Sequence, residues 1–309
     1  MRPQTIAADP SVPDGPPAAA VWPGVALAMA GSIAFSGKAI IVKLAYRYGV
    51  DAVTLITYRM LFALPLFALL AWWAGRGKPV LTRRDWAVVT GLGFCGYYLA
   101  SFLDFAGLAY ITASFERLIL YLNPTLVLAM GVFVFKREVN ARQIIALAVS
   151  YSGVLLVFGH EVTFQGTHAA LGAGLVFASA ISYAVYLVAS GEEVKRLGAL
   201  RLTGLATGVA CLFCIAQFLV LRPLSALEVA PQVIWLSLLN ATLCTFAPVL
   251  MVMMAIERIG ASVAAQTGMI GPLSTILMGV VILGEPFTGW LLAGTVLVLS
   301  GIWLLTKWR

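Results

Sequence analysis

Charged side chains inside apolar segments are the residues of this chain that could do chemistry. Six such residues are present: Lys38, Lys43, Arg59, Asp104, Glu116 and Arg117. An ionisable group is costly in lipid, so these residues are expected to face the protein interior, a partner or water. All six lie in the first 120 residues, and four of them are basic. Lys38 lies deepest in its segment, and we expect it to attract a carboxylate group of a ligand.

Helical spacing groups these charges with polar neighbours. Glu116 and Asn123 are seven positions apart and share one helix face. Tyr97, Ser101 and Asp104 share a face on an earlier segment. Glu116 is the candidate proton carrier, because a low-dielectric pocket favours its neutral form while neighbouring cations favour the charged form. Proton coupling and simple facilitated exchange are therefore both open.

Further polar and aromatic side chains are expected to line the same pocket: Tyr121, Tyr183, Tyr186, Asn240 and Gln266. Tyr121 and Tyr183 could stack on a planar ligand or hold its ammonium group by a cation–π contact. Helix packing is the alternative role for the aromatic residues. For Asn240 and Gln266 the alternative is hydrogen bonding between helices, which contributes only about 0.6 kcal/mol on average in membranes.

Three of the charges have simpler roles open to them. Lys43 and Arg117 lie near segment ends, from which a long side chain can reach the membrane interface. Arg59 could be a structural partner of Asp104 or of a helix-end carbonyl. We therefore treat one set as a charge network, distinct from the ligand-contacting residues: Arg59, Asp104, Glu116, Arg117 and Lys43.

The composition identifies the surroundings of these residues. The 309-residue chain is 61% hydrophobic and 11% charged, with a mean hydropathy of +0.97. Soluble domains carry about 25% charged residues, so the sequence predicts an all-α polytopic membrane protein. A span needs about 20 mostly apolar residues. Ten segments qualify as transmembrane helices: 22–45, 53–74, 86–108, 112–135, 141–158, 169–190, 201–221, 232–255, 261–283 and 288–306.

The second half of the chain repeats the first at an offset of 148 residues. Pro124 returns as Pro272 and Gly153 returns as Gly301, with no gap between the pairs. Such self-similarity indicates a duplication. Five spans per copy is an odd number, so the two copies enter the membrane from opposite sides. We predict a disordered tail at residues 1–20. Two inverted five-helix repeats, 21–160 and 169–309, are predicted to form one transport domain.

Inverted repeats are the architecture of many secondary transporters, in which two halves rock around a site near the bilayer midplane. Pro124 and Pro272 each lie about 17–18 Å along their segments, at 1.5 Å per residue. A proline removes one helical hydrogen bond and favours a kink. We interpret the two prolines as paired gate or cavity-wall positions, with a packing kink as the alternative.

Basic residues orient the bundle. With the N-terminus in the cytoplasm, fourteen Lys and Arg residues fall on the inner side and two on the outer side. The sequence therefore predicts a multi-pass protein of the cell inner (plasma) membrane with both termini cytoplasmic. The net charge of +7 is explained by this topology, so contact with the lipid bilayer is expected and nucleic acid is not.

Few residues support an enzyme or a metal centre. Cys211 and Cys214 have redox-motif spacing, but they lie within one apolar segment without a nearby His, so we interpret them as packing residues. His160 and His168 fall in one expected connecting loop, outside every span. We therefore expect no metal, no cofactor and no enzymatic activity. A non-transporting sensor or assembly subunit is a further alternative, although the chain has no soluble signalling domain.

Three motifs resemble a known family. The run from Phe35 to Leu44, Phe-Ser-Gly-Lys-Ala-Ile-Ile-Val-Lys-Leu, resembles the opening span of the drug/metabolite transporter superfamily, in its EamA-type branch. Arg59 matches a second-span motif of that branch, and Gly284-Glu285-Pro286 resembles its closing signature. The resemblance implies a ten-helix fold with cytoplasmic termini. Members include exporters of amino acids and other small metabolites.

The chain departs from that family pattern in three places. Phe35-Ser36 replaces the usual Trp-Gly, and Lys38 takes a position that is commonly small or amide-bearing. Lys136-Arg137-Glu138 stands where the first repeat often reads Gly-Glu-Arg. Lys38 is the departure that could change the chemistry of a central cavity.

These observations lead to one functional hypothesis and its rivals. The sequence predicts a secondary active transporter, an exporter of small polar metabolites, with amino acids or related compounds as the best single guess. The transport would follow alternating access between the repeats, with proton coupling or exchange. A drug or toxic-metabolite effluxer with broad selectivity is the runner-up.

Overall fold

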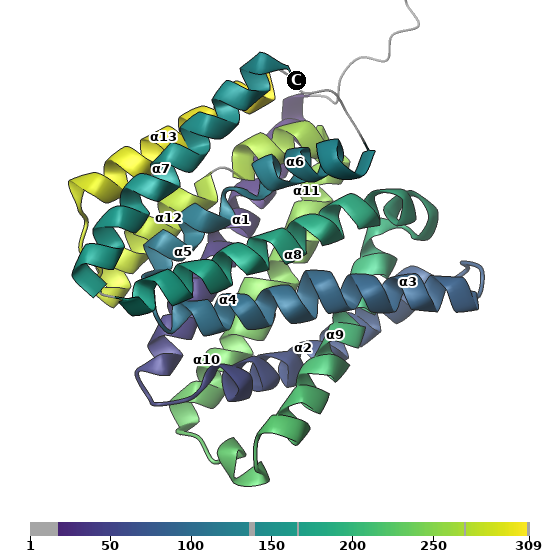
Figure 1. Cartoon of the computed structure of the whole chain (residues 1–309). Coiled ribbons are helices and arrows are strands. Elements are labelled where there is room, and N and C mark those ends of the chain that lie inside the picture. The colour runs from purple at the N-terminus through teal and green to yellow at the C-terminus, as the bar shows by residue number, and fades with distance from the viewer. Residues whose placement is uncertain (1–17, 136–139, 166, 269, 308–309) are drawn as a thin grey trace, which may run out of the picture.

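The computed structural model describes residues 18–135, 140–165, 167–268 and 270–307. Within these ranges the chain is helical and forms no strand (Figure 1). Seven helical segments are long and apolar enough to cross a membrane, and two shorter apolar segments, Ile270–Leu283 and Gly289–Leu304, accompany them. The prediction of an all-α polytopic membrane protein is confirmed.

The first repeat contains seven α-helices and one π-helical turn. In chain order they are α1 (Ala18–Tyr46), α2 (Ala52–Gly75), α3 (Arg83–Gly93), η1 (Phe94–Leu99), α4 (Ala100–Leu108), α5 (Ala113–Leu120), α6 (Asn123–Phe135) and α7 (Ala141–Gln165). The first seventeen positions of the predicted disordered tail lie outside the described residues, as does Lys136-Arg137-Glu138. The tail prediction is wrong for 18–20, because these three alanines, the best helix formers, already belong to α1.

The second repeat follows the same plan. Its elements are α8 (Thr167–Leu197), α9 (Ala199–Leu221), the short 3-10 helix η2 (Leu224–Leu227), α10 (Pro231–Ala241), η3 (Thr242–Phe246), α11 (Ala247–Gly268), α12 (Ile270–Met278), η4 (Gly279–Leu283) and α13 (Gly289–Lys307). The expected loop around His160 and His168 is wrong, since these residues lie in α7 and α8.

A helix break in the first repeat is the main difference from the predicted spans. The predicted continuous helix 112–135 is interrupted at Tyr121–Leu122, directly before Asn123-Pro124. A proline lacks the N–H that would continue the helix and is well suited to the first turn of a new one. In the second repeat, the connection expected at 256–260 is helical and lies within α11 (Ala247–Gly268).

Two π-helical turns obey the repeat symmetry, because η1 begins at Phe94 and η3 begins at Thr242, 148 positions later. Discontinuous helices near the midplane commonly form the substrate site of secondary transporters, and π-helical turns are frequent at functional sites.

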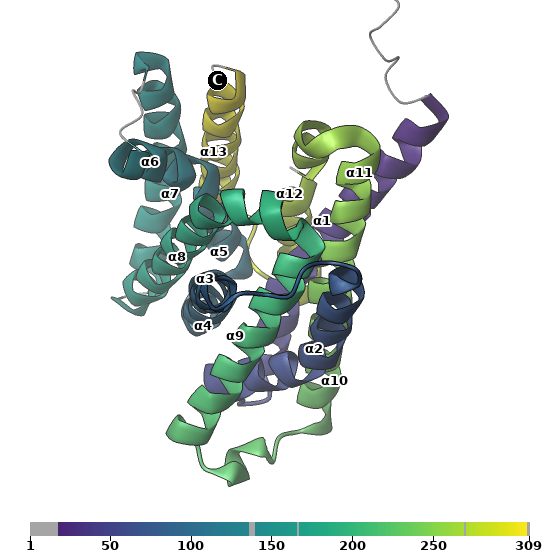
Figure 2. The same ribbon diagram turned by 90° about the vertical axis from the view of Figure 1, so that its right-hand side faces the viewer.

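The main helix contacts join one repeat to the other. Helix α1 packs on α11, α4 on α8, α2 on α9 and α7 on α13. Both ribbon views show α7 and α13 side by side, with α1 and α11 as another adjacent pair (Figure 2). Contacts of this kind place the space between the repeats at the centre of the molecule.

Glycine allows the close crossing of α7 and α13, and we predict opposite effects for two glycines of α7. A Cβ added at Gly153 would lie 2.6 Å from the carbonyl oxygen of Gly294, whereas nothing lies within 4 Å of one added at Gly159. Gly153→Ala should therefore destabilise the protein by about 1–3 kcal/mol through overpacking. Gly159→Ala should be neutral or stabilising by up to about 1 kcal/mol, since alanine suits a helix better. Thermal unfolding in detergent would contradict this prediction if both variants matched the wild type.

Candidate functional site

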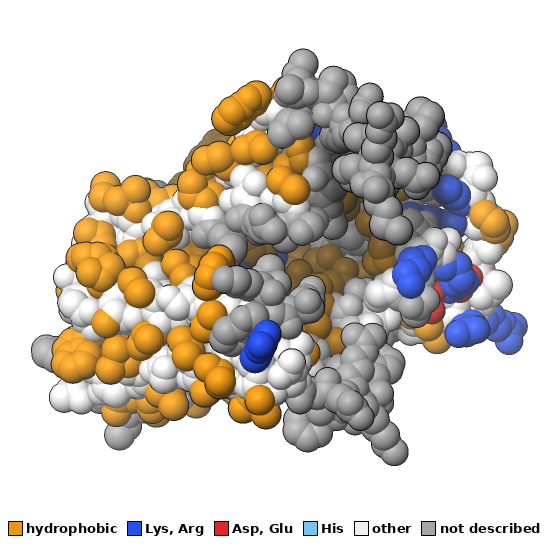
Figure 3. Space-filling view, turned by 90° about the horizontal axis from the view of Figure 1, so that it is seen from above, with side chains coloured by type: hydrophobic (Ala, Val, Ile, Leu, Met, Phe, Trp, Pro, Cys, Tyr) orange, Lys and Arg blue, Asp and Glu red, His pale blue; other side chains and the backbone are white. Residues whose placement is uncertain are grey.

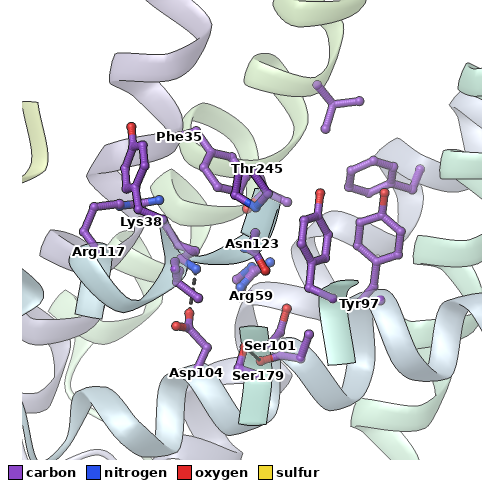
Figure 4. Close-up of a pocket in the computed structure, with 18 residues that line it drawn as sticks. Phe35, Lys38, Arg59, Tyr97, Ser101, Asp104, Arg117, Asn123, Ser179 and Thr245 are labelled. Carbon is purple, nitrogen blue, oxygen red and sulfur yellow. Dashed lines mark hydrogen bonds and ion pairs between the residues drawn. The ribbon is translucent and has the colours of Figure 1, made fainter. Parts of the chain in front are cut away.

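A cavity of about 320 Å³ lies between the two repeats. It is lined by residues of α1, α2, η1, α4, α5, α6, α8, η3 and α11, so it contacts the α5–α6 break and both repeat-related π-helical turns (Figure 4). Its size is at the lower end of the range for small-molecule sites, roughly 300–1,000 Å³. The cavity therefore has room for one small organic molecule.

Several pairs of repeat-related positions line this cavity. Phe35 and Tyr183 both line it, and their numbers differ by 148. The same offset relates Tyr97 to Thr245 and Ser101 to Val249, and all four of these residues line the cavity. The site thus follows the pseudo-symmetry of the fold, but with different chemistry from each repeat.

Lys38 and two carboxylates form a buried ion cluster beside the cavity. The Lys38 Nζ donates to Asp104 Oδ2 at 2.5 Å and lies 3.8 Å from Glu116 Oε1. Figure 4 shows the Lys38 side chain directed towards Asp104. Glu116 is fully buried and does not line the cavity, whereas Lys38 and Asp104 do. The expected carboxylate anchor is thus already paired with a carboxylate of the protein.

Two arginines of the cavity wall have unused donors. Among the described residues, the Nε and Nη1 atoms of Arg59 and the Nη2 of Arg117 have no hydrogen-bond partner. Arg59 lies over the ring of Phe105, with its guanidinium carbon 5.1 Å from the ring centroid. Arg117 donates through Nε to Thr275 Oγ1 at 3.1 Å. Arg117 is buried at the cavity wall, so its side chain does not extend to the interface.

Aromatic side chains supply much of the remaining wall. Tyr97, Tyr121 and Tyr183 line the cavity together with Phe35. Tyr186 lies behind them, with its hydroxyl 3.1 Å from that of Tyr97 and its ring stacked on Tyr183 at 5.6 Å between centroids. The cavity therefore has flat apolar surfaces next to its charged side chains.

The structure gathers most of the predicted site residues and separates a few. Lys38, Tyr97, Ser101, Tyr121, Asn123, Tyr183, Arg59, Asp104, Arg117 and Pro124 line the cavity. Asn240 is buried behind it, with Nδ2 3.5 Å from the carbonyl oxygen of Lys38, the helix-to-helix role considered as its alternative. Pro272 is buried in α12 away from the cavity lining. The side chain of Gln266 lies outside the described residues.

Lys43 does not line the cavity. Its Nζ donates to the carbonyl oxygens of Leu108 at 3.1 Å and Ile111 at 2.9 Å, at the end of α4. A cation at a helix C-terminus is favourable, because the last carbonyls lack helical partners. Lys43 therefore stabilises the end of α4.

Several cavity residues are not predicted from the sequence. Phe67, Ser179, Thr245 and Val249 line the wall without having been predicted. The repeat offset applied to Tyr97 and Ser101 would have found Thr245 and Val249. Ser179 donates to the carbonyl oxygen of Ala100 at 2.7 Å, and no local pattern in the sequence signals that partner.

Glu285 belongs to the family motif Gly284-Glu285-Pro286, and the sequence predicts no structural role for it. Its carboxylate accepts from the backbone N–H of Ala113 at 2.6 Å, the N–H of Ser114 at 3.1 Å and the Ser114 hydroxyl at 2.7 Å. Gly284, with φ of 73°, ends η4 in the left-handed conformation and turns the chain towards α5. A carboxylate at a helix N-terminus satisfies free donors and complements the helix dipole. The contact ties the second repeat to the first.

A second hydrogen-bonded contact between the two repeats lies nearby. Arg47 donates through Nη2 to the carbonyl oxygen of Leu283 at 2.7 Å. We call the side of the molecule with the connections 47–51, 109–112 and 284–288 the Glu285 end. At that end, residues of the two repeats are joined by direct hydrogen bonds.

In the described ranges, no group of three or more His, Cys, Asp or Glu residues is arranged to hold a metal ion. The four cysteines are unpaired, and three of them are buried. Cys211 contacts the sulfur of Met60 at 3.6 Å, which agrees with a packing role.

Comparison with known proteins assigns the family. The model of the EamA-like transporter family matches twice, at residues 22–159 and 170–307. The chain is 28% identical over 276 residues to the uncharacterized transporter YcbK of Bacillus subtilis, covering 85% of this chain and 86% of that one. It is 23% identical over 287 residues to the uncharacterized transporter YetK of the same organism, covering 91% and 86%.

A solved crystal structure shares the fold. It superposes with a TM-score of 0.62 at 16% identity, covering 92% of this chain and 96% of the other. The two family matches confirm the duplication inferred from the 148-residue offset. Because they cover most of the chain, this protein belongs to the EamA-like transporter family.

Proposed function

We propose that the protein is a secondary transporter that exports a small polar metabolite, an amino acid or a related compound, by alternating access between its repeats. The observation that carries the proposal is the cavity at the repeat interface, which is lined by the helix break and by repeat-related positions. Secondary transporters commonly bind substrate in such a place. The substrate would lie between the aromatic side chains and the charged side chains of the cavity.

The distribution of basic residues supports an inner-membrane location with both termini in the cytoplasm. The Glu285 end then faces outward, and its cross-repeat hydrogen bonds hold the outer side closed. Figure 3 shows the face on the side of the C-terminus hollowed near its middle, with hydrophobic side chains in the hollow. In this reading, substrate enters from the cytoplasm and leaves after the Glu285 contact has opened.

Coupling is assigned to Glu116 within the same proposal. Its carboxylate lies 3.8 Å from Lys38 Nζ and 3.9 Å from Arg117 Nε, so a change in its protonation alters the charge beside both cavity cations. Glu116→Gln should then remove the dependence of flux on a pH gradient. Unchanged rate and pH profile in that variant would favour simple exchange.

The experiment that tests the proposal is flux through purified protein. Proteoliposomes loaded with a panel of labelled amino acids and N-acyl or deaminated derivatives should release one class saturably. Protein-free liposomes and protein blocked by a competing substrate are the controls. Lack of saturable release of any compound from well-folded protein would contradict export and favour a non-transporting sensor.

A broad-selectivity effluxer is the second candidate, and the apolar lining favours it. Phe35, Phe67, Leu120 and Val249 contribute to the wall, and such surfaces bind many hydrophobic compounds. Competition separates the two candidates. Unrelated hydrophobic cations should inhibit amino-acid release if the cavity is unselective and should have no effect if its polar groups select the substrate.

A further inference from the structure

We infer that the cavity selects substrates of net charge −1, with a carboxylate held by Arg59 and Arg117 and no need for an ammonium group. The inference rests on the proposed function and names the substrate class for the same cavity. It differs from the sequence-based expectation, in which Lys38 would bind the carboxylate.

The charged side chains beside the cavity do not balance. Three cations, Lys38, Arg59 and Arg117, face two carboxylates, Asp104 and Glu116, and each of the five residues is at most 8% exposed. The remaining residues of the cavity wall are uncharged. With both carboxylates ionised, the group therefore has a formal charge of +1, and an uncompensated charge in a low-dielectric site is costly. A bound monoanion would neutralise it.

The repeat-related positions of the second half do not supply the missing negative charge. The positions 148 residues after the five charged ones are all neutral: Tyr186, Thr207, Val252, Ala264 and Ala265. The charge imbalance is therefore a property of one repeat, in a site that both repeats build.

Lys38 is the cation of the cluster that already has carboxylate partners. Lys38 already has Asp104 at 2.5 Å and Glu116 at 3.8 Å. The unused donors belong to the guanidinium groups: among the described residues, Nε and Nη1 of Arg59 and Nη2 of Arg117 lack partners. Buried donors without partners are unfavourable, and guanidinium groups suit planar carboxylates. The structure thus assigns the anion to the arginines.

The charge cluster does not favour an ammonium group on the substrate. Asp104 Oδ1 is free of hydrogen bonds in the described residues, so it could accept from an ammonium. That carboxylate is already the partner of Lys38, however, and a second cation beside it would compete with Lys38. A zwitterion would also leave the charge of +1 in place, whereas an N-acylated or deaminated acid would cancel it.

The aromatic wall defines the rest of the substrate. Tyr97, Tyr121 and Tyr183 line the cavity together with the two arginines and Phe35. Figure 4 labels Phe35 and Tyr97 among these aromatic residues. Flat rings stack favourably on such side chains. The substrate class is therefore a monocarboxylate with an aromatic or other flat apolar body that fits about 320 Å³.

The test compares one skeleton in three charge states. N-acetyl-L-phenylalanine is a monoanion, L-phenylalanine a zwitterion and phenethylamine a cation at neutral pH. The thermal stability of purified protein should rise with the monoanion at concentrations at least about tenfold lower than with the zwitterion, and it should not respond to the amine. In proteoliposomes, the labelled monoanion should exchange faster than the zwitterion.

Arg117→Gln is the test variant, and Arg142→Gln, at an exposed position of α7, is the matched control. The first should lose the preference for the monoanion, while the control keeps it. If Arg117→Gln does not fold, the three-ligand comparison on the wild type decides alone. Tighter binding and faster flux of L-phenylalanine or phenethylamine would overturn the inference and leave the transporter proposal standing. Flux of none of the compounds in the wider panel would instead contradict the transporter proposal.

Discussion

Lys38→Met is expected to lower the free energy of unfolding by about 3–5 kcal/mol, because it leaves a buried carboxylate without its ion-pair partner. Lys38 contacts Asp104 at 2.5 Å, and the Asp104 side chain is only 2% exposed. Glu116, 3.8 Å away and fully buried, loses the same neighbouring cation. Equilibrium unfolding of the purified protein in detergent measures the loss.

A double variant separates the ion pair from other effects of the substitution. Lys38→Met together with Asp104→Leu removes both charges, and replacing a buried pair by apolar residues is often close to neutral. We expect the double variant to recover most of the lost stability while substrate flux stays impaired. Lys78→Met, at an exposed position between α2 and α3, is the control and should have no effect. Equal stability of the single and double variants would contradict a specific Lys38–Asp104 pair.

Glu285→Ala should loosen the start of α5 and open the Glu285 end. The substitution removes the acceptor of two backbone N–H groups and one hydroxyl, those of Ala113 and Ser114. Hydrogen bonds to a charged group contribute about 1.5–3 kcal/mol each, so even partial compensation by water leaves a large effect. Amide hydrogen exchange at residues 113–116 should accelerate by about 10- to 100-fold, a local opening visible without global unfolding.

Two controls make this result specific to Glu285. Glu228→Ala removes an exposed carboxylate from the connection between α9 and α10 and should leave exchange in α5 unchanged. Glu285→Gln keeps an oxygen acceptor without the charge and should lie between the wild type and Glu285→Ala. Unchanged exchange at residues 113–116 in Glu285→Ala would show that the carboxylate does not hold this helix start.

The Glu285 contact gives the motif Gly284-Glu285-Pro286 a structural role outside the cavity. Gly284 supplies the positive φ that reverses the chain, and Glu285 then reaches a helix 172 positions earlier in sequence. The motif suggested only a family resemblance, because nothing near it in the sequence indicates the N-terminus of α5 as a partner.

In the candidate site, helical spacing predicts some of the residues that share a surface, whereas others depend on the tertiary structure. Spacing placed Tyr97, Ser101 and Asp104 on one face, and all three line the cavity. Spacing also grouped Glu116 with Asn123, but Asn123 lines the cavity whereas Glu116 lies behind it. The break before Asn123 changes the direction of the helix face, so a seven-residue spacing across it no longer describes one surface.

The sequence by itself determined the helical membrane class, the duplication at an offset of 148 residues and the family. Hydropathy, self-similarity and motifs are properties of the linear sequence, and they do not depend on how the helices pack. Only the tertiary structure decided that Lys38 pairs with Asp104, that Arg59 and Arg117 hold the unused donors, and that Glu285 binds the start of α5. Those facts depend on which helices cross and where each helix breaks, and helix crossing brings together residues that no local pattern connects.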